Sequence, residues 1–206
     1  MLKVGLTGSI AVGKSFVSEC LREAGCRVLD ADSTARDVVA PKTAGLAAIV
    51  SRFGSEILTQ NGQLDRAKLG AIVFADEDKR KLLNSIVHPL VFDAQKIWLK
   101  AVETEDPNGI AVVDAALMIE SGGYKRFSKI IVVWCEPEIQ LKRLMARDKL
   151  DASDAIRRID SQMPQDEKKR FADFLIDTSS DFESTRRQAN RVVQELRRTA
   201  QISDDD

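Results

Sequence analysis

Apolar residues follow two different spacings in the first thirty residues of the chain. Val4 and Leu6 alternate with small or polar neighbours over residues 3–7, which predicts a short strand that runs into a glycine loop. From Lys14 the apolar residues recur every three or four positions, which predicts a helix with a glycine at its C-terminal end. The run "CRVLDAD" (26–32) predicts a second strand that ends in two acids. Strand, loop, helix and strand in this order are typical of a parallel α/β sheet.

The sheet pattern pauses after the second strand. Residues 33–104 show mostly helical spacing, interrupted by turn signals at Pro41, Gly54, "QNGQ" and "HP". Because this stretch is longer than a plain crossover between neighbouring strands needs, the pattern predicts a helical insertion.

Strand patterns return in the second half of the chain. "IAVVDAALMIE" (110–120) and "KIIVVWC" (129–135) are apolar runs rich in β-branched residues, which are typical of buried parallel strands. A highly charged helical region (136–170) follows, and "ADFLIDT" (172–178) predicts one more strand. Residues 181–200 predict a closing amphipathic helix, and the tail "SDDD" is expected to fray.

Composition narrows the class of protein. The 206 residues carry nearly equal numbers of acids and bases, for a formal charge of −1, so no bulk basic field for nucleic acid exists. A hydrophobic content of 44% and a charged content of 31% fit one globular domain with inserted pieces. The three scattered cysteines lack CxxC spacing and are expected to be core thiols in a reducing compartment. No apolar run nears the ~20 residues that span a bilayer, and no signal-type segment opens the chain, so a cytoplasmic protein without a membrane partner is expected.

A phosphate-binding motif stands at the first strand–helix junction. Within "GLTGSIAVGKS" (5–15), the last eight residues read G-x-x-x-x-G-K-S. Gly8 and Gly13 permit turns that point backbone N–H groups inward. Lys14 can reach the β- and γ-phosphates of a nucleotide, and Ser15 can offer its hydroxyl to Mg²⁺. The motif is the strongest chemical signal in the chain, because an apolar strand precedes it and an amphipathic helix follows.

Acids at strand ends and one histidine are further candidates. Alternation in a strand would send Asp30 and Asp32 to one face, where a carboxylate could take a proton from an attacking hydroxyl. The alternative is that Asp32 or Ser33 caps the following helix. Asp114 follows four apolar residues, where an acid could order Mg²⁺ or its waters. His88, the only histidine, precedes a proline and is expected more often in a turn than in catalysis.

Basic residues gather in the charged helical region. Arg143 and Arg147 are four residues apart and share a helix face. Further cations follow at Arg157, Arg158 and Lys168. A solvated helix is the ordinary interpretation, but a mobile lid that brings arginines to a migrating phosphoryl group fits the phosphate loop better.

The successive motifs resemble the dephospho-coenzyme A kinase family. The resemblance covers residues 3 to 195, and the succession of motifs is more specific than any one of them beyond the phosphate loop. The motifs, in family order, are "LTGSIAVGKS", "VLDADSTAR", "HPLV", "DAALMIESGGY", "QLKRLMARD", "RIDSQMP", "EKKRFADFLID" and "TRRQ". The resemblance implies an α/β P-loop kinase core with a parallel five-stranded sheet. It also implies a helical substrate-binding insertion (36–105) and a helical lid (138–171) within one domain, 1–206.

The family reaction implied by the resemblance moves the γ-phosphoryl of ATP, with Mg²⁺, to the ribose 3′-hydroxyl of dephospho-coenzyme A. Asp32 takes the place of the acid near the accepting hydroxyl, and Arg36 and His88 match positions near the substrate. Arg143, with Arg147 as second candidate, corresponds to the lid cations. The segment around the ATP phosphates corresponds to Ala11, Val12, Gly13, Lys14, Ser15 and Phe16. A monomer or weak homo-oligomer is expected.

Several positions depart from the family pattern. The loop usually reads G-G-I-G-S-G-K-S, whereas Ser9, Ala11 and Val12 replace a glycine, a glycine and a serine here. Ala116 replaces the proline of P-L-L-x-E, and Thr178 stands where an asparagine normally helps to seat the adenine. The changes bear on loop stiffness and base selectivity more than on the chemistry.

Other functions stay open at this point. A GTPase switch is disfavoured because no N-K-x-D motif appears, and a motor usually needs a larger core and a basic path. The alternatives are another small-molecule or nucleoside monophosphate kinase, and a nucleotide-binding regulator without turnover.

Overall fold

The computed structural model describes residues 1–202, so the prediction for the tail "SDDD" lies outside the described residues. The chain forms two compact units. The first consists of Met1–Leu29 together with the chain from Ala101 onward, and the second of Asp30–Lys100. The predicted limits of the insertion (36–105) and of the lid (138–171) stay predictions, because they concern substrate binding and closure. No helix within residues 1–202 has both the length and the apolar character needed to cross a membrane.

The first unit is built on a five-stranded sheet in the order β2-β3-β1-β4-β5. Its central strand β1 pairs in parallel with β3 on one side and with β4 on the other, and β4 pairs in parallel with β5. The strands are β1 (Leu2–Gly8), β2 (Arg27–Asp30), β3 (Ile110–Asp114), β4 (Lys129–Trp134) and β5 (Phe174–Asp177). The register sets Leu6 opposite Asp114, so the loop after β1 and the acid that ends β3 meet at one edge of the sheet. The predicted parallel α/β fold is confirmed.

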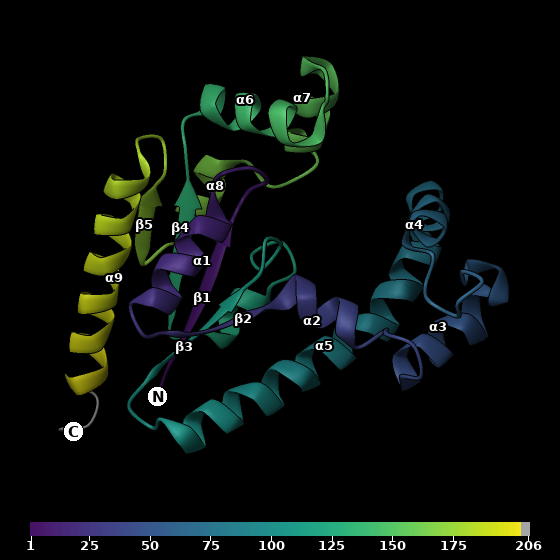
Figure 1. The fold of residues 1–206 in the computed structure, drawn as a ribbon, viewed down its shortest axis with the longest axis horizontal. Coiled ribbons are helices and arrows are strands. Elements are labelled where there is room, and N and C mark those ends of the chain that lie inside the picture. The colour runs from purple at the N-terminus through teal and green to yellow at the C-terminus, as the bar shows by residue number, and fades with distance from the viewer. Residues whose placement is uncertain (203–206) are drawn as a thin grey trace. The chain divides into compact units, whose positions relative to one another are not determined.

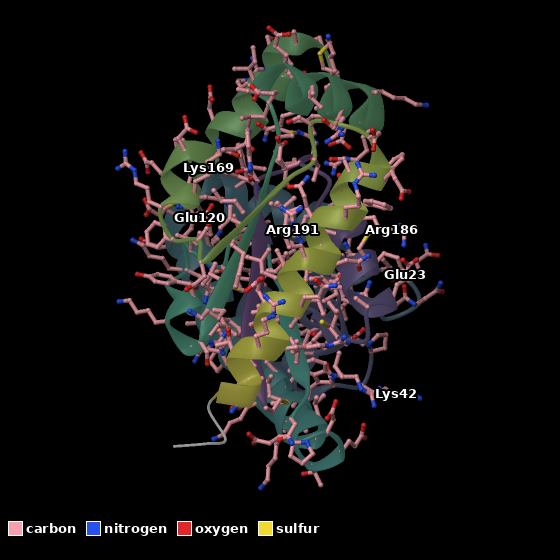
Figure 2. The ribbon with its side chains drawn as sticks, turned by 90° about the vertical axis from the view of Figure 1, so that its left-hand side faces the viewer. Glu23, Lys42, Glu120, Lys169, Arg186 and Arg191 are labelled. Carbon is pink, nitrogen blue, oxygen red and sulfur yellow. The ribbon has the colours of Figure 1, made fainter. Side chains whose placement is uncertain are left out.

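Helices cover the sheet and extend beyond one end of it. In Figure 1, α6 and α7 lie above the carboxyl end of β4, and α9 runs beside the sheet near α1. Arg186 of α9 forms an ion pair with Glu23 of α1, and the two side chains point toward one another in Figure 2. The helices of this unit are α1 (Lys14–Glu23), η2 (Gly123–Arg126), α6 (Pro137–Asp148), α7 (Ala152–Asp160), α8 (Gln165–Lys169) and α9 (Phe182–Ile202).

The core of the first unit explains the apolar spacing in the sequence. Val4 and Leu6 of β1 are fully buried, and so is Leu21 on the inner face of α1. Leu196 contributes from α9, which presents one apolar stripe to the same cluster. Burial of these side chains stabilises the strand and the helix on either side of the phosphate loop, at ~25 cal/mol per Å² of apolar surface removed from water.

The second unit is helical, as its sequence pattern predicts. Its helices are α2 (Ala31–Asp37), α3 (Ala44–Phe53), η1 (Ser55–Ile57), α4 (Arg66–Ala75) and most of α5 (Glu77–Glu105). A separate apolar cluster that includes Ile49, Ile57 and Leu69 forms its core. The turn predicted at "HP" is wrong, since α5 continues through Pro89. Ser85, whose carbonyl loses its helical partner at Pro89, is exposed, so water can satisfy that oxygen.

Two of the predicted strands end at least two residues before their sequence patterns do. The second strand ends at Asp30, whose carboxylate accepts hydrogen bonds from the backbone N–H groups of Asp32 and Ser33 and caps α2. The expectation that both acids share one face of a strand is therefore wrong, because Asp32 lies in the first turn of a helix. The third strand ends at Asp114, and a loop follows in which Met118 and Ile119 are buried while Leu117 is 52% exposed.

Candidate phosphate site and lid

The phosphate loop joins β1 to α1 and requires unusual backbone angles. Gly13 has φ 83° directly before the first residue of α1, and Ala11 has φ 60°. A Cβ atom on Gly8 would lie 2.6 Å from the backbone oxygen of Val133, so only glycine fits there. A Cβ atom on Gly13 would lie 3.2 Å from Oγ1 of Thr178. A side chain at Gly8 would therefore clash with backbone. A side chain at Gly13 would crowd the Thr178 side chain and would have to adopt a left-handed φ.

Lys14 and Asp114 meet at the edge of the sheet. The Lys14 ammonium donates to Oδ1 of Asp114, and the Ser18 hydroxyl donates to Oδ2 of the same carboxylate. Both side chains of the ion pair are largely buried, with 16% of Lys14 and 7% of Asp114 exposed. Ser15, at the first turn of α1, is exposed. Low exposure strengthens the attraction between the two charges, so the pair holds the lysine beside the loop.

One of the two predicted lid arginines reaches the neighbourhood of the loop. Arg143 of α6 donates to the hydroxyl of Thr178 (2.9 Å) and to the Thr178 carbonyl oxygen (2.8 Å). The Thr178 hydroxyl in turn donates to the carbonyl oxygen of Val12 in the loop (2.7 Å). A chain of hydrogen bonds therefore runs from α6 to the phosphate loop through Thr178.

The other predicted lid arginine has a different partner. Arg147 donates from Nε (2.8 Å) and Nη2 (3.2 Å) to the carboxylate of Asp148, which also accepts from Arg158 (2.8 Å). The hydrogen bond to Asp148 raises the pKa of Arg147, and the same bond lowers the pKa of the Asp148 carboxyl. Arg158 of α7 thereby contacts the last residue of α6.

Two glutamines that the sequence analysis did not single out contact the loop from α6 and from the segment after α7. Gln140 of α6 donates to the carbonyl oxygen of Ile10, and Gln162 accepts from the Ile10 N–H group, both at 2.8 Å. Both residues lie in the quoted motifs "QLKRLMARD" and "RIDSQMP". The available signal was an uncharged amide within a highly charged region.

A cavity of about 560 Å³ lies beside these glutamines, a size in the usual range for ligand pockets. Its lining includes Ser9, Trp134, Gln140 and Gln165. The Ser9 hydroxyl is buried and has no hydrogen-bond partner among the described residues. Lys169 places its ammonium 3.7 Å from the centre of the Trp134 ring.

The predicted substrate-side residues belong to the second unit. Asp32 and Arg36 both lie in α2 and are exposed, and the Arg36 carbonyl accepts from Arg66 at 3.5 Å. His88 is exposed on α5, with its ring 6.2 Å from that of Phe92. Their approach to the phosphate loop stays a prediction. Within residues 1–202, no three histidine, cysteine, aspartate or glutamate side chains form a group that could hold a metal by themselves.

The comparisons with known proteins agree on one family. The model of the family described as dephospho-CoA kinase matches residues 2–184. A dephospho-CoA kinase of Listeria monocytogenes is 49% identical over 187 residues, covering 90% of this chain and 92% of the relative. The chain belongs to the dephospho-CoA kinase family. Members of this family are ATP-using kinases that phosphorylate dephospho-CoA to CoA.

Solved structures extend the comparison to the fold. A dephospho-CoA kinase from Campylobacter jejuni superimposes with a TM-score of 0.73 at 32% identity, covering 96% of this chain and 98% of that one. A shikimate kinase from Acinetobacter baumannii shares only the fold, with a TM-score of 0.50 at 17% identity over 95% of this chain and 93% of that one. The predicted P-loop kinase core is thereby confirmed.

The loop departures from the dephospho-CoA kinase pattern have structural consequences. Ala11 adopts a left-handed backbone where the family pattern has glycine, which costs about 1 kcal/mol relative to glycine. Ser9, at another family glycine, buries its hydroxyl. Thr178, in place of the family asparagine, uses its hydroxyl to join Arg143 to Val12. The threonine therefore has a structural role in this chain.

Proposed function

We propose that this chain transfers the γ-phosphoryl group of ATP to the ribose 3′-hydroxyl of dephospho-CoA and releases CoA and ADP. The observation that carries the proposal is the phosphate loop with Lys14 held beside it by Asp114, in a chain that matches the dephospho-CoA kinase family over residues 2–184. A P-loop alone would fit many kinases. The family match selects the acceptor.

The donor nucleotide is assigned to the segment Ala11–Phe16. Backbone N–H groups of this segment and the N-terminus of α1 would bind the phosphates, because α1 begins directly at the loop. Lys14 would exchange its contact with Asp114 for one with the β- and γ-phosphates. The Lys14 ammonium would thus face an anion both before and after the exchange, so its charge is never buried without a partner.

Ser15 and Asp114 are assigned to Mg²⁺. Their hydroxyl and carboxylate oxygens are hard ligands of the kind that Mg²⁺ prefers, and phosphate oxygens and water would supply the remaining ligands. Bound Mg²⁺ supplies charge neutralisation at the β- and γ-phosphates. The Asp114 carboxylate becomes available to it when Lys14 moves to the nucleotide.

Asp32 is assigned as the base on the acceptor side. Its carboxylate would accept the proton of the ribose 3′-hydroxyl while the oxygen forms a bond to the γ-phosphorus and the bond to the ADP leaving oxygen breaks. Arg36 and His88 are assigned to binding of dephospho-CoA. All three are exposed, as residues that meet a substrate must be.

Arg143 and Arg147 are assigned to the lid. Cations near the migrating phosphoryl group stabilise its charge, and closure excludes water that would otherwise be phosphorylated. Arg143 is the stronger assignment, because its guanidinium already joins Thr178 and, through it, the loop residue Val12. We also place the reaction in the cytoplasm, in a monomer or weak homo-oligomer, in keeping with the free thiols of all three cysteines.

The function is tested by incubating the protein with Mg·ATP and dephospho-CoA and locating the new phosphate by NMR. We expect ADP formation that depends on dephospho-CoA and a phosphate at the ribose 3′ position. ADP formation with a different acceptor would identify another kinase. Absence of any acceptor-dependent ADP would identify a nucleotide-binding regulator.

The role of Asp32 is tested by Asp32→Asn. Loss of the base should lower kcat by roughly 10²–10⁴-fold while ATP binding stays near that of the wild type. The matched control is Asp30→Asn, because asparagine caps a helix about as well as aspartate and Asp30 only caps α2. Near-normal turnover of Asp32→Asn would reject Asp32 as the base.

A further inference from the structure

We propose that Gln140 and Gln162 are positioning residues that orient the backbone of the phosphate loop from the lid side. The proposal rests on the proposed function, since it assigns these glutamines to the ATP-binding loop of that reaction. We call Gln140, Gln162 and Gln165 the glutamine clamp.

The clamp binds both backbone groups of one loop residue. Nε2 of Gln140 donates to the Ile10 carbonyl oxygen, and the Ile10 N–H group donates to Oε1 of Gln162, both at 2.8 Å. Gln165 supports the clamp, because its Nε2 donates to Oε1 of Gln140 at 2.8 Å. Its own Oε1 accepts from the backbone N–H of Cys135, at the end of β4, at 3.1 Å. The side chains are therefore tied both to the loop and to the sheet.

Peptide geometry carries the clamp's effect to the phosphate side of the loop. The peptide bond between Ile10 and Ala11 is planar and trans, so the Ile10 carbonyl and the Ala11 N–H point in opposite directions. Gln140 holds that carbonyl on the lid side. The Ala11 N–H, the first of the segment assigned to the phosphates, is thereby directed away from Gln140.

The clamp acts where the loop is strained. Ala11 has φ 60°, a left-handed conformation that side-chain-bearing residues seldom adopt. Strain of this kind persists where surrounding contacts over-determine the backbone. Two hydrogen bonds at the preceding residue provide that constraint.

Burial of Gln140 makes the clamp favour one orientation of the peptide between Ile10 and Ala11. Gln140 is only 2% exposed, so an orientation that left its amide or the Ile10 carbonyl unpaired would leave a polar group without water. The native loop conformation satisfies both groups at once. A loop with the peptide flipped would present the Ala11 N–H to the side-chain NH₂ of Gln140, two donors facing each other.

The two contacts with Ile10 run in opposite directions, which provides a matched pair of variants. Gln140 donates and Gln162 accepts. A glutamate in place of Gln140 loses the donor and sets a carboxylate against a carbonyl, whereas a glutamate in place of Gln162 keeps the acceptor. Both substitutions add the same charge beside the loop. Because Gln140 is 2% exposed and Gln162 is half-buried, the uncharged variants Q140M and Q162M control for the different cost of burying that charge.

The experiment compares Q140E, Q140M, Q162E and Q162M with the wild type. ATP affinity is measured by titration calorimetry. The kcat and the KM for ATP are measured at saturating dephospho-CoA, and the KM for dephospho-CoA is measured at saturating ATP. We expect Q140E, Q140M and Q162M to weaken ATP binding or kcat/KM for ATP about tenfold, the effect of one lost hydrogen bond, with KM for dephospho-CoA unchanged. We expect Q162E to stay within about threefold of the wild type. Equal effects of Q140E and Q162E, or none in either, would overturn the proposal.

A second variant separates positioning from general packing. Ala11→Gly removes the steric penalty of the left-handed backbone, so the loop should depend less on the clamp. In the double variant A11G/Q140M, the loss relative to A11G should shrink to about threefold or less. Purely additive losses, together with a matching fall in thermal stability, would show that Gln140 only packs the lid. Because calorimetry with ATP needs no acceptor, the clamp is tested even where the wild type fails to phosphorylate dephospho-CoA.

Discussion

At the scale of single residues, burial decides how the cysteines behave. Cys20, Cys26 and Cys135 are free and buried, as the sequence predicted for core thiols. Burial raises the pKa of all three thiols, and it raises that of Cys26 to about 11 although the positive charge of Arg197 lowers it. The thiolate is the reactive form, so these side chains are structural at neutral pH.

Cys26 gives a prediction with a definite sign. Because its pKa is higher in the folded protein than the ~8.5 of an unfolded thiol, folding stability from this group is complete below pH 8 and is lost as the pH rises toward 11. Denaturant unfolding at pH 8 and at pH 11 measures the loss, which we expect to be about 2–3 kcal/mol.

The control for Cys26 is Cys26→Ala, which should lack this part of the pH dependence. Iodoacetamide at pH 8 should also leave Cys26 unmodified until the protein is unfolded. Rapid alkylation of the native protein at Cys26 would contradict the assignment.

At the scale of elements, a buried lysine fastens α8 to the loop that follows β3. The side chain of Lys168 is fully buried, and its ammonium donates to Glu120 at 2.8 Å and to the Ala116 carbonyl oxygen at 3.0 Å. The same carbonyl accepts from the Thr7 hydroxyl of β1 at 3.1 Å. One carbonyl thus joins α8, the β3 loop and the central strand.

The two partners of this ion pair should tolerate substitution unequally. Glu120→Ala leaves the Lys168 ammonium buried without its counter-charge, and we expect a loss of about 3 kcal/mol. Lys168→Met leaves Glu120, whose side chain is 24% exposed and can bind water, so the loss should be roughly half as large. Urea denaturation of both variants and of the double variant measures the difference. A larger loss for Lys168→Met than for Glu120→Ala would contradict this account.

At the scale of the whole molecule, the sheet order determines where chemistry can occur. Because β1 is central, with β3 and β4 paired on either side, the loop after it is surrounded by strand ends on both sides. Asp114 comes from one neighbour, and Gln165 reaches the backbone after the other. Ligands in open α/β sheets bind at such an edge, beyond the carboxyl ends of the strands.

Nucleotide binding should therefore stabilise the molecule against heat. At 100 times its Kd, Mg·ATP adds about 2.7 kcal/mol, which raises Tm by roughly 5–10 °C in a chain of this size. Lys14→Ala should lose most of that shift, while Lys79→Ala, a solvent-exposed lysine on α5, should keep it. Chelation of Mg²⁺ should reduce the shift of the wild type. A full shift in Lys14→Ala would contradict the phosphate assignment.

The sequence by itself determined the phosphate loop, the order of strands and helices, the helical insertion and the family. These features follow from spacing: a motif over eight residues, and apolar periods of two or near four. Local rules failed where two short-range signals competed. Asp30 and Asp32 match the end of a strand pattern, but Asp30 caps α2 and Asp32 lies in its first turn. Pro89 matches a turn signal but lies within α5.

Only the tertiary structure decided which side chains meet. Gln140 and Gln162 bind Ile10 from more than a hundred residues away, and Thr178 reaches Val12 across a similar separation. The partner of a hydrogen bond between residues so far apart in sequence depends on how α6 and the segment after α7 pack on the sheet. The sequence around a glutamine does not show which group its amide will bind. The spacing of residues in the motif predicts that phosphate is bound. The packing of the folded chain decides which side chains hold the loop that binds it.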